Sequence, residues 1–346
     1  MERRLFVLLL HLKELNVSSV TNWNNMQEMD NISLTNSQVI LMGILEIGNW
    51  RYLYSLGIIL NTVPVLVLSS LILFVTYTEE ALHQPMYIFI SNLMFNEIYT
   101  TIFTSKLLID VLSGRYTIPF VECLVQGFFM QSCPCVEMFT FTVMAYDRYL
   151  AIGHPLRYPM LMTNKTALRI LLAIWVYVLV GIGICVMLTS RQTLCGVEIN
   201  SMFCETISLN HLSCDGTYSV DFGFTWDFIM LVGCGFVVLY CYIRTFIVCF
   251  SISGDASRKA LHTLVTHMIA FSTFFTSFVF PVFRYRYKGD AETVMSHILF
   301  SLPGALSFFL NPLIYGFRIE ALRKKILQKL TREKREISDR GKKRKN

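Results

Sequence analysis

The chain has 346 residues, of which 54% are hydrophobic and 16% are charged. Soluble domains carry about 25% charged residues, so this composition favours a membrane protein. The formal net charge is +6, and most of the excess lies after Phe317, so the charge does not indicate a nucleic-acid partner. Ten cysteines are too few for a disulfide scaffold, and no CxxC pair with a histidine cluster indicates a metal site.

Residues 1–51 are polar and rich in Asn, and we expect them to form an extracellular segment. Asn16 and Asn31 each begin an Asn-X-Ser triplet, which is the acceptor sequence for N-glycosylation. The candidate initiator methionines are Met1, Met26 and Met29.

Seven apolar segments follow, each long enough for the roughly 20 residues that a helix needs to cross a bilayer. They cover residues 52–76, 86–111, 123–152, 167–188, 222–250, 262–285 and 292–317. The pattern predicts an all-α membrane protein, with a seven-helix bundle formed by residues 52–317. Residues 318–330 have an apolar and a basic side, so they predict an amphipathic helix, and a basic cytoplasmic tail continues to residue 346.

The distribution of Lys and Arg in the short loops predicts the orientation, because cytoplasmic loops are enriched in both. The loops after the third segment and before the sixth are basic, with Arg157, Lys165, Arg258 and Lys259. The long loop between the fourth and fifth segments is acidic. We therefore expect a multi-pass protein of the plasma membrane with its N-terminus outside the cell. The first inner loop, with Glu79 and Glu80, runs against this rule.

Asp147, Arg148 and Tyr149 stand at the end of the third apolar segment. A charge at the centre of a membrane helix costs about 2.5–3.5 kcal/mol on insertion scales, and less near the interface. A snorkelling side chain would explain Arg148 alone. It would not explain an adjacent acid followed by Pro155 and Pro159, so this stretch indicates a functional site.

Residues 144–152 together with 154–158 resemble the end of the third helix of odorant receptors, which are rhodopsin-type G-protein-coupled receptors. Further similar stretches are residues 83–87, 91–93, 259–263 and 311–315. The resemblance implies a receptor that binds a small odorant and activates a heterotrimeric, olfactory-type stimulatory G protein. It implies no catalytic activity and no cofactor other than an allosteric sodium ion. We expect the fish-like (class I) type.

The resemblance also implies roles for individual residues. Asp147, Arg148 and Tyr149 would hold the resting state and then meet the G protein. Lys259 lies at the inner end of the sixth segment, where the G protein would dock or where a basic face would simply snorkel. The stretch that contains Asn311, Pro312 and Tyr315 would rearrange on activation, and its proline lacks a backbone donor.

Four cysteines lie on the predicted outer side: Cys123, Cys195, Cys204 and Cys214. Four cysteines allow three pairings, and the compartment is oxidising. The resemblance implies the pairs Cys123–Cys204 and Cys195–Cys214, which would hold the long loop as a lid over the mouth of the bundle.

Glu97 and Glu137 are carboxylates inside apolar segments, where each is costly unless it is protonated, paired or bound to a cation. The resemblance places Glu97 where related receptors hold sodium and Glu137 beside it. Either the two share one Na⁺ or one proton that stabilises the resting state, or they are unrelated polar residues. Ser69 stands where the resemblance calls for Asn.

The predicted ligand contacts in the sixth segment have i, i+4, i+7 and i+11 spacing, which places them on one helical face. They are Phe275, Val279, Val282 and Arg286. Arg286 either binds acidic odorants or lies at the outer rim of the membrane. The resemblance adds Met130, Gln131 and Cys135 of the third segment to the same pocket.

Other membrane proteins fit less well. A rhodopsin-type receptor for an amine would typically have an Asp in the outer half of the third segment, where Met130 and Gln131 stand. A transporter would need paired repeats with broken helices, and no half of this chain has a second copy. A membrane enzyme would need a constellation such as HExxH, which is absent from the sequence.

Overall fold

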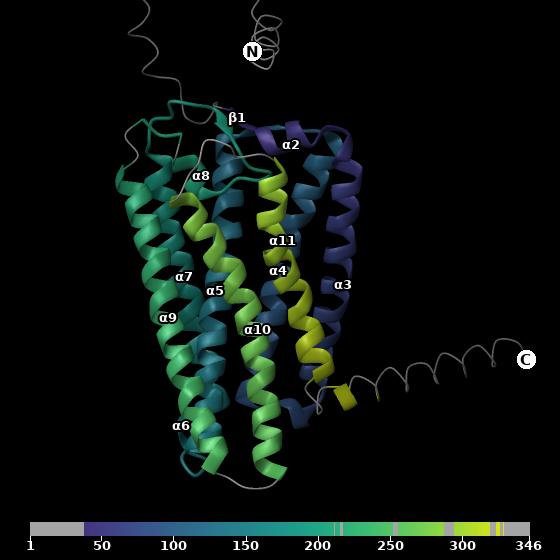
Figure 1. Cartoon of the computed structure of the whole chain (residues 1–346), viewed down its shortest axis with the longest axis vertical. Helices are drawn as coiled ribbons and strands as arrows, with labels where there is room; N and C mark the ends of the chain where they lie inside the picture. Colours follow the sequence, from purple (N-terminus) through teal and green to yellow (C-terminus); the bar gives the residue numbers. More distant parts are fainter. Residues whose placement is uncertain are drawn as a thin grey trace, which may run out of the picture. The chain divides into compact units, whose positions relative to one another are not determined.

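A computed structural model describes the chain from Gln38 onward, with short gaps. The described residues are 38–210, 212–214, 217–251, 255–286, 294–318, 323–325 and 328. In this part of the chain seven long helices run side by side (Figure 1). They are α3 (Arg51–Thr78), α4 (Pro85–Ser113), α5 (Phe120–Gly153), α7 (Asn164–Ser190), α9 (Thr217–Ser251), α10 (Asp255–Arg286) and α11 (Val294–Arg318).

These helices coincide with the seven predicted segments, so the all-α bundle predicted from the sequence is confirmed. The largest difference is at α10, which begins at Asp255, whereas the apolar run begins at residue 262. By length and hydropathy alone, three helical runs of the described part qualify as membrane spans: Met42–Thr78, Asn164–Ser190 and Phe222–Ser251. Helices α4 and α5 contain buried polar residues, which include Glu97 and Glu137.

Local signals set where the helices begin and end. Pro85 opens α4 in its first turn, where a missing N–H costs nothing, and Gly114 ends the helix with a φ of 67°. The Oγ1 of Thr163 accepts a hydrogen bond of 3.2 Å from the N–H of Thr166 and so caps α7.

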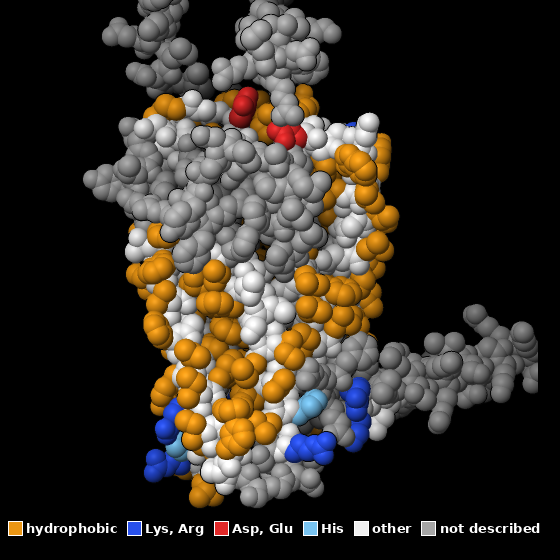
Figure 2. Space-filling view, viewed as in Figure 1, with side chains coloured by type: hydrophobic (Ala, Val, Ile, Leu, Met, Phe, Trp, Pro, Cys, Tyr) orange, Lys and Arg blue, Asp and Glu red, His pale blue; other side chains and the backbone are white. Residues whose placement is uncertain are grey.

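The bundle buries a core and leaves an apolar exterior. Fully buried side chains include Phe89, Met138, Phe141 and Tyr315. Large apolar side chains are also exposed on the sides of α3, α4, α7 and α9, and Figure 2 shows hydrophobic side chains covering the flank of the bundle. A soluble bundle would place polar residues there, so this exterior suits lipid.

The two ends of the bundle carry different short elements. One end, called here the disulfide end, holds β1 (Gln38–Leu41), α2 (Met42–Ile47), η4 (Gly48–Trp50), β2 (Thr117–Pro119), β3 (Glu198–Ile199) and α8 (Thr206–Asn210). The other, called here the Arg148 end, holds η5 (Glu80–Leu82) and α6 (Tyr158–Leu161). Lys and Arg side chains gather at the Arg148 end in Figure 2.

A small sheet at the disulfide end was not predicted from the sequence. Strand β1 pairs antiparallel with β2, with Val39 opposite Ile118, and parallel with β3, with Ile40 opposite Glu198. Next to β1, a Cβ on Gly43 would lie 2.6 Å from the carbonyl oxygen of Ser201, so only glycine allows this approach. The residues just before α3 therefore bind the loop that follows α7.

Candidate functional site

The loop between α7 and α9 is fastened to the top of α5. The structure contains the disulfides Cys123–Cys204 and Cys195–Cys214, which is the pairing that the resemblance implies. The N–H of Cys204 donates a 3.0 Å hydrogen bond to Oε1 of the buried Gln126. The loop thus lies directly on the bundle, and Phe203, Glu205 and Thr206 line the cavity beneath it.

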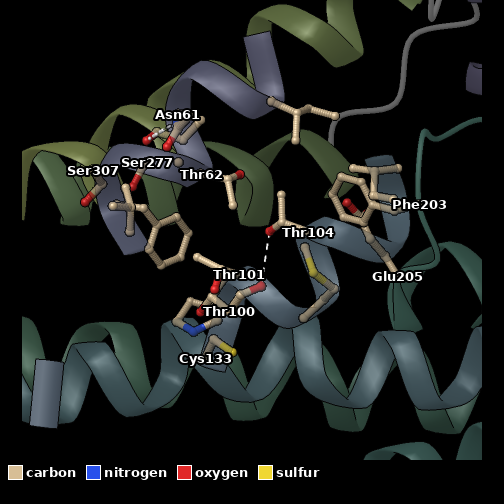
Figure 3. Close-up of a pocket in the computed structure, with 18 of the residues that line it drawn as sticks. Asn61, Thr62, Thr100, Thr101, Thr104, Cys133, Phe203, Glu205, Ser277 and Ser307 are labelled. Carbon is tan, nitrogen blue, oxygen red and sulfur yellow. Dashed lines mark hydrogen bonds between the residues drawn. The ribbon is translucent and has the colours of Figure 1, made fainter. Parts of the chain in front are cut away.

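A cavity of about 940 Å³ lies within the bundle at this end. Its walls come from α2, η4, α3, α4, α5, α8, α9, α10 and α11 and from the loop before α8. Figure 3 shows polar side chains from four of these helices around the space: Asn61, Thr62, Thr100, Thr101, Thr104, Ser277 and Ser307. Much of the remaining wall is apolar, including Ile58, Leu107, Phe274, Phe278 and Phe308. A mainly apolar cavity of this size with a few polar groups is typical of small-molecule sites.

The structure places the predicted ligand contacts in different surroundings. Met130 and Gln131 line the cavity. Cys135 is fully buried in the core instead, and Phe275 and Val279 pack against that core and are not part of the cavity wall. The side chains of Val282 and Arg286 lie outside the described part of the chain.

Two of the four predicted contacts in α10, Phe275 and Val279, thus lie outside the wall of this cavity, and the set that binds an odorant stays a prediction. Among the described side chains of α10, those in the wall are Phe274, Ser277 and Phe278. The ring of Phe275 approaches α9, where a Cβ on Gly235 would lie 3.6 Å from it. Helical spacing identifies residues that share a face, but it does not fix the direction in which that face points, and adjacent residues differ by about 100°.

Asp227 of α9 also lines the cavity, and it was not among the residues predicted from the sequence. Its side chain is 5% exposed. Nε2 of Gln131 lies 3.5 Å from its Oδ1 and 3.4 Å from its Oδ2. A carboxylate inside an apolar segment was the signal used for Glu97 and Glu137, and it applied equally to Asp227.

Glu97 and Glu137 meet at one amide in the centre of the bundle. Nδ2 of Asn311 donates to Oε1 of Glu97 at 2.8 Å and to Oε1 of Glu137 at 2.6 Å. Glu97 is 1% exposed, and Glu137 and Asn311 are 0% exposed. The other oxygen of each carboxylate and Oδ1 of Asn311 have no hydrogen-bond partner. The two acids are therefore not unrelated polar residues.

This arrangement fits a shared proton or a small hard cation. Two ionised carboxylates on one amide would repel each other, and an added positive charge would remove that repulsion. The unpartnered groups are all oxygens, which suit sodium-like ions. Within the described residues, no group of three or more His, Cys, Asp or Glu side chains could hold a metal ion, so a cation would depend on Glu97, Glu137 and the Asn311 oxygen.

Ser69 is fully buried, and its hydroxyl has no hydrogen-bond partner. The resemblance calls for Asn at this position. The unsatisfied hydroxyl of Ser69 lowers the stability of the fold.

At the Arg148 end, Asp147 is 0% exposed and has three hydrogen bonds. Arg148 donates to Oδ2 from Nη2 at 2.8 Å and from Nε at 3.2 Å. The hydroxyl of Tyr158 donates to Oδ1 at 2.8 Å. Burial raises the pKa of Tyr158, so its phenol stays protonated and keeps this role as donor. Tyr149 instead contacts His154, with 3.1 Å between its hydroxyl and Nε2.

Near the same end, Tyr315 of α11 joins α10. Its hydroxyl lies 3.3 Å from Nδ1 of His267, and both side chains are buried. Pro312 is buried one turn before Tyr315, next to Asn311. The three predicted switch residues are thus fully inside the bundle, and two of them contact other helices. The His267 contact was not predicted. The side chain of Lys259 lies outside the described part of the chain.

Comparison with known proteins agrees with this geometry. Residues 69–315 match the family of 7 transmembrane receptors (rhodopsin family). Olfactory receptor 6E1 of Mus musculus is 31% identical over 290 residues, which cover 83% of this chain and 92% of that protein. Olfactory receptor 6N1 of Homo sapiens is 31% identical over 303 residues, which cover 86% of this chain and 96% of that protein.

The chain belongs to the olfactory receptor family. Olfactory receptor 6F1 of Homo sapiens is also similar, with 32% identity over 263 residues that cover 75% of this chain and 84% of that protein.

Membership of the olfactory receptors makes the chain a multi-pass membrane receptor rather than an enzyme. The fish-like type stays a prediction. The acceptor residues Asn16 and Asn31 lie outside the described part of this olfactory receptor.

Proposed function

We propose that the chain is an odorant receptor that binds a small organic molecule in the cavity beneath the disulfide-bonded loop. The cavity itself carries this proposal, because it is of ligand size, mainly apolar and bordered by a few hydroxyl and amide groups. Its roof is held in place by Cys123–Cys204 and by the bond from Cys204 to Gln126.

A chain of contacts supports transmission from the cavity to the Arg148 end. Glu97 borders the cavity and also accepts a hydrogen bond from Asn311 of α11. Farther along α11, Tyr315 contacts His267 of α10. A ligand that changes the position of α11 would therefore change contacts along α10 as well. Binding would shift an existing equilibrium between resting and active arrangements, because a ligand favours the state that it binds better.

The Arg148 end would be the site of G-protein coupling. In the resting arrangement Asp147 holds Arg148 by an ion pair, and Tyr158 supports the same carboxylate. Release of Arg148 would offer a cation to the G protein, together with Tyr149 and Lys259. This assignment requires the Arg148 end to face the cytosol and the N-terminus to lie outside, which the basic loops and the disulfides at the opposite end support.

The cluster of Glu97, Glu137 and Asn311 would stabilise the resting arrangement by sharing one proton or one Na⁺. It joins α4, α5 and α11 at a point between the cavity and Arg148.

The test is a ligand screen in cells that co-express the olfactory stimulatory G protein. The cells are exposed to short carboxylic acids, amines, alcohols, amino acids and bile acids, and cAMP is recorded against antibody-measured receptor at the surface. We expect at least one of these compounds to raise cAMP in a saturable way. The control is a set of cells that express an unrelated membrane protein. If the receptor reaches the surface and no compound raises cAMP above that control, the proposed function is wrong.

A further inference from the structure

Asp227 is a buried carboxylate whose hydrogen-bonding capacity is largely unused. Within the described part of the chain, its only polar contacts are those from Nε2 of Gln131 at 3.4 and 3.5 Å, which are longer than the usual 2.7–3.2 Å range for N–H···O bonds. Among the described side chains, no Lys, Arg or His forms an ion pair with it. A buried charge without a cationic partner is costly, so this site has a strong preference for a positive group.

The rest of the cavity has the same polarity. Its wall contains the carboxylates Glu46, Glu97, Glu205 and Asp227, and no Lys, Arg or His is found among the wall residues that the structure describes. A cavity lined by one sign of charge within low-dielectric walls raises the local concentration of ligands of the opposite sign.

Gln131 provides a second acceptor beside Asp227. Its Nε2 is turned toward the carboxylate, and its Oε1 is buried without a hydrogen-bond partner. An ammonium group has three donors, so it could reach both the carboxylate and this amide oxygen. The apolar part of such a ligand would find the wall that includes Phe274, Phe278 and Phe308.

We propose that this cavity selects odorants that carry a protonated amine, with Asp227 as the counter-ion and Gln131 Oε1 as a second acceptor. The inference rests on the proposed odorant-receptor function and specifies its ligand class. It gives the opposite charge preference from an acid anchored at Arg286. The carboxylate of an acidic ligand would be repelled by the charge of Asp227, and an alcohol would leave that charge unpaired.

The test compares three ligands with the same carbon chain: hexylamine, hexan-1-ol and hexanoic acid. The full-length receptor is expressed with the olfactory stimulatory G protein, and half-maximal concentrations for cAMP are measured at matched surface amounts. We expect hexylamine to act at concentrations about tenfold or more below those of hexan-1-ol, and hexanoic acid to be the weakest. A hydrogen bond to a charged group is worth about 10- to 150-fold in affinity.

Substitutions then assign the preference to Asp227. Asp227→Asn should raise the half-maximal concentration of hexylamine by about 10- to 100-fold and change that of hexan-1-ol by less than about threefold. Asp227→Glu keeps the charge and should retain most of the amine preference. Glu198→Gln is the control, because Glu198 is an exposed carboxylate at the same end of the bundle and is not part of the cavity wall, and it should change the response to either ligand little.

Three results would overturn the amine assignment. Hexylamine could be no better than hexan-1-ol, hexanoic acid could be the best agonist, or Asp227→Asn could weaken amine and alcohol equally. The last result would make Asp227 a structural residue, and Gln131→Met would then give the same uniform loss. Each of these results leaves an odorant receptor with another specificity. A receptor that is present at the surface and silent to all three ligands and to the wider screen would overturn the proposed function as well.

Discussion

Asp147 and Asp227 are both buried aspartates of long helices, but their surroundings differ. Asp147 accepts two hydrogen bonds from Arg148 and one from Tyr158, all between 2.8 and 3.2 Å. Among the described residues, Asp227 has only the long contacts from Gln131. The first carboxylate is satisfied by the protein itself, whereas the second is left to be satisfied by something that enters the cavity.

The same contrast extends to the regions around the two residues. Near Arg148, Tyr149, His154 and Tyr158 are joined to one another or to Asp147. In and below the cavity, Glu97, Gln131 and Ser307 each have a buried polar atom without a partner. Unsatisfied buried polar groups cost free energy, so they are tolerated where a ligand or an ion can satisfy them. The polar groups around Asp147 are thus satisfied within the protein, and those of the cavity wall are left for a ligand or an ion.

The largest expected effect comes from removing the cation at the Arg148 end. Arg148→Gln should abolish the evoked cAMP response, because it removes the group that the G protein would meet once the ion pair opens. Evoked cAMP is measured at matched surface amounts, since Asp147 loses its charge partner and folding suffers. The control Arg157→Gln removes an exposed cation of the adjacent loop and should leave most of the response. An Arg148→Gln receptor with a normal response would show that the contact with Asp147 is only structural.

A smaller effect is expected where the two regions join. Glu137→Gln removes the carboxylate that shares the Asn311 amide with Glu97, so the resting arrangement should lose its shared proton or cation. Basal cAMP without odorant should rise, by about fivefold for each kcal/mol of lost stabilisation.

The matched control for Glu137→Gln is Glu80→Gln, which makes the same chemical change at an exposed position. Equal basal cAMP in the two variants would mean that the central cluster does not control the equilibrium.

The smallest expected effect is at Tyr158. Tyr158→Phe deletes one of the three hydrogen bonds to Asp147 and leaves the ion pair with Arg148 in place. Arg148 still satisfies the carboxylate, so we expect a loss at the low end of the range for a bond to a charged group, about 1.5 kcal/mol, and a rise in basal cAMP of no more than about tenfold. Tyr146→Phe removes a hydroxyl from an exposed tyrosine of α5 and is the control. If Tyr146→Phe raised basal cAMP as much as Tyr158→Phe, the rise would not come from the lost bond to Asp147.

Much of the fold could be predicted from the sequence because the long helices coincide with apolar runs, and bilayer thickness requires runs of that length. The start of α10 was predicted too late for the same reason. Residues 255–261 include Arg258 and Lys259, so hydropathy ends the segment although the helix continues. Strand β1 was missed because its partners, β2 and β3, are distant in sequence and the short segment has no periodic pattern of its own.

The site was predictable where it depends on motifs and unpredictable where it depends on which side chains face inward. The resemblance placed Glu137 beside Glu97, but the contact of both with Asn311 was not predicted, because it needs three helices to be placed together. The wall residues Phe274 and Ser277 were missed because spacing does not orient a helix. The Asp expected in a receptor for amines was placed in the third segment alone, whereas Asp227 approaches Gln131 from α9.

The most direct test of the account is to fill the cavity without touching the Arg148 end. Ser277 lines the cavity, whereas its neighbour Thr276 is exposed on the outer side of α10. We predict that Ser277→Phe abolishes the response to every agonist of the receptor and retains the surface amount and basal cAMP of the parent, while Thr276→Phe leaves the dose–response curve unchanged. A Ser277→Phe receptor that responds to the same agonists at unchanged half-maximal concentrations would contradict the claim that odorant binding in this cavity drives signalling.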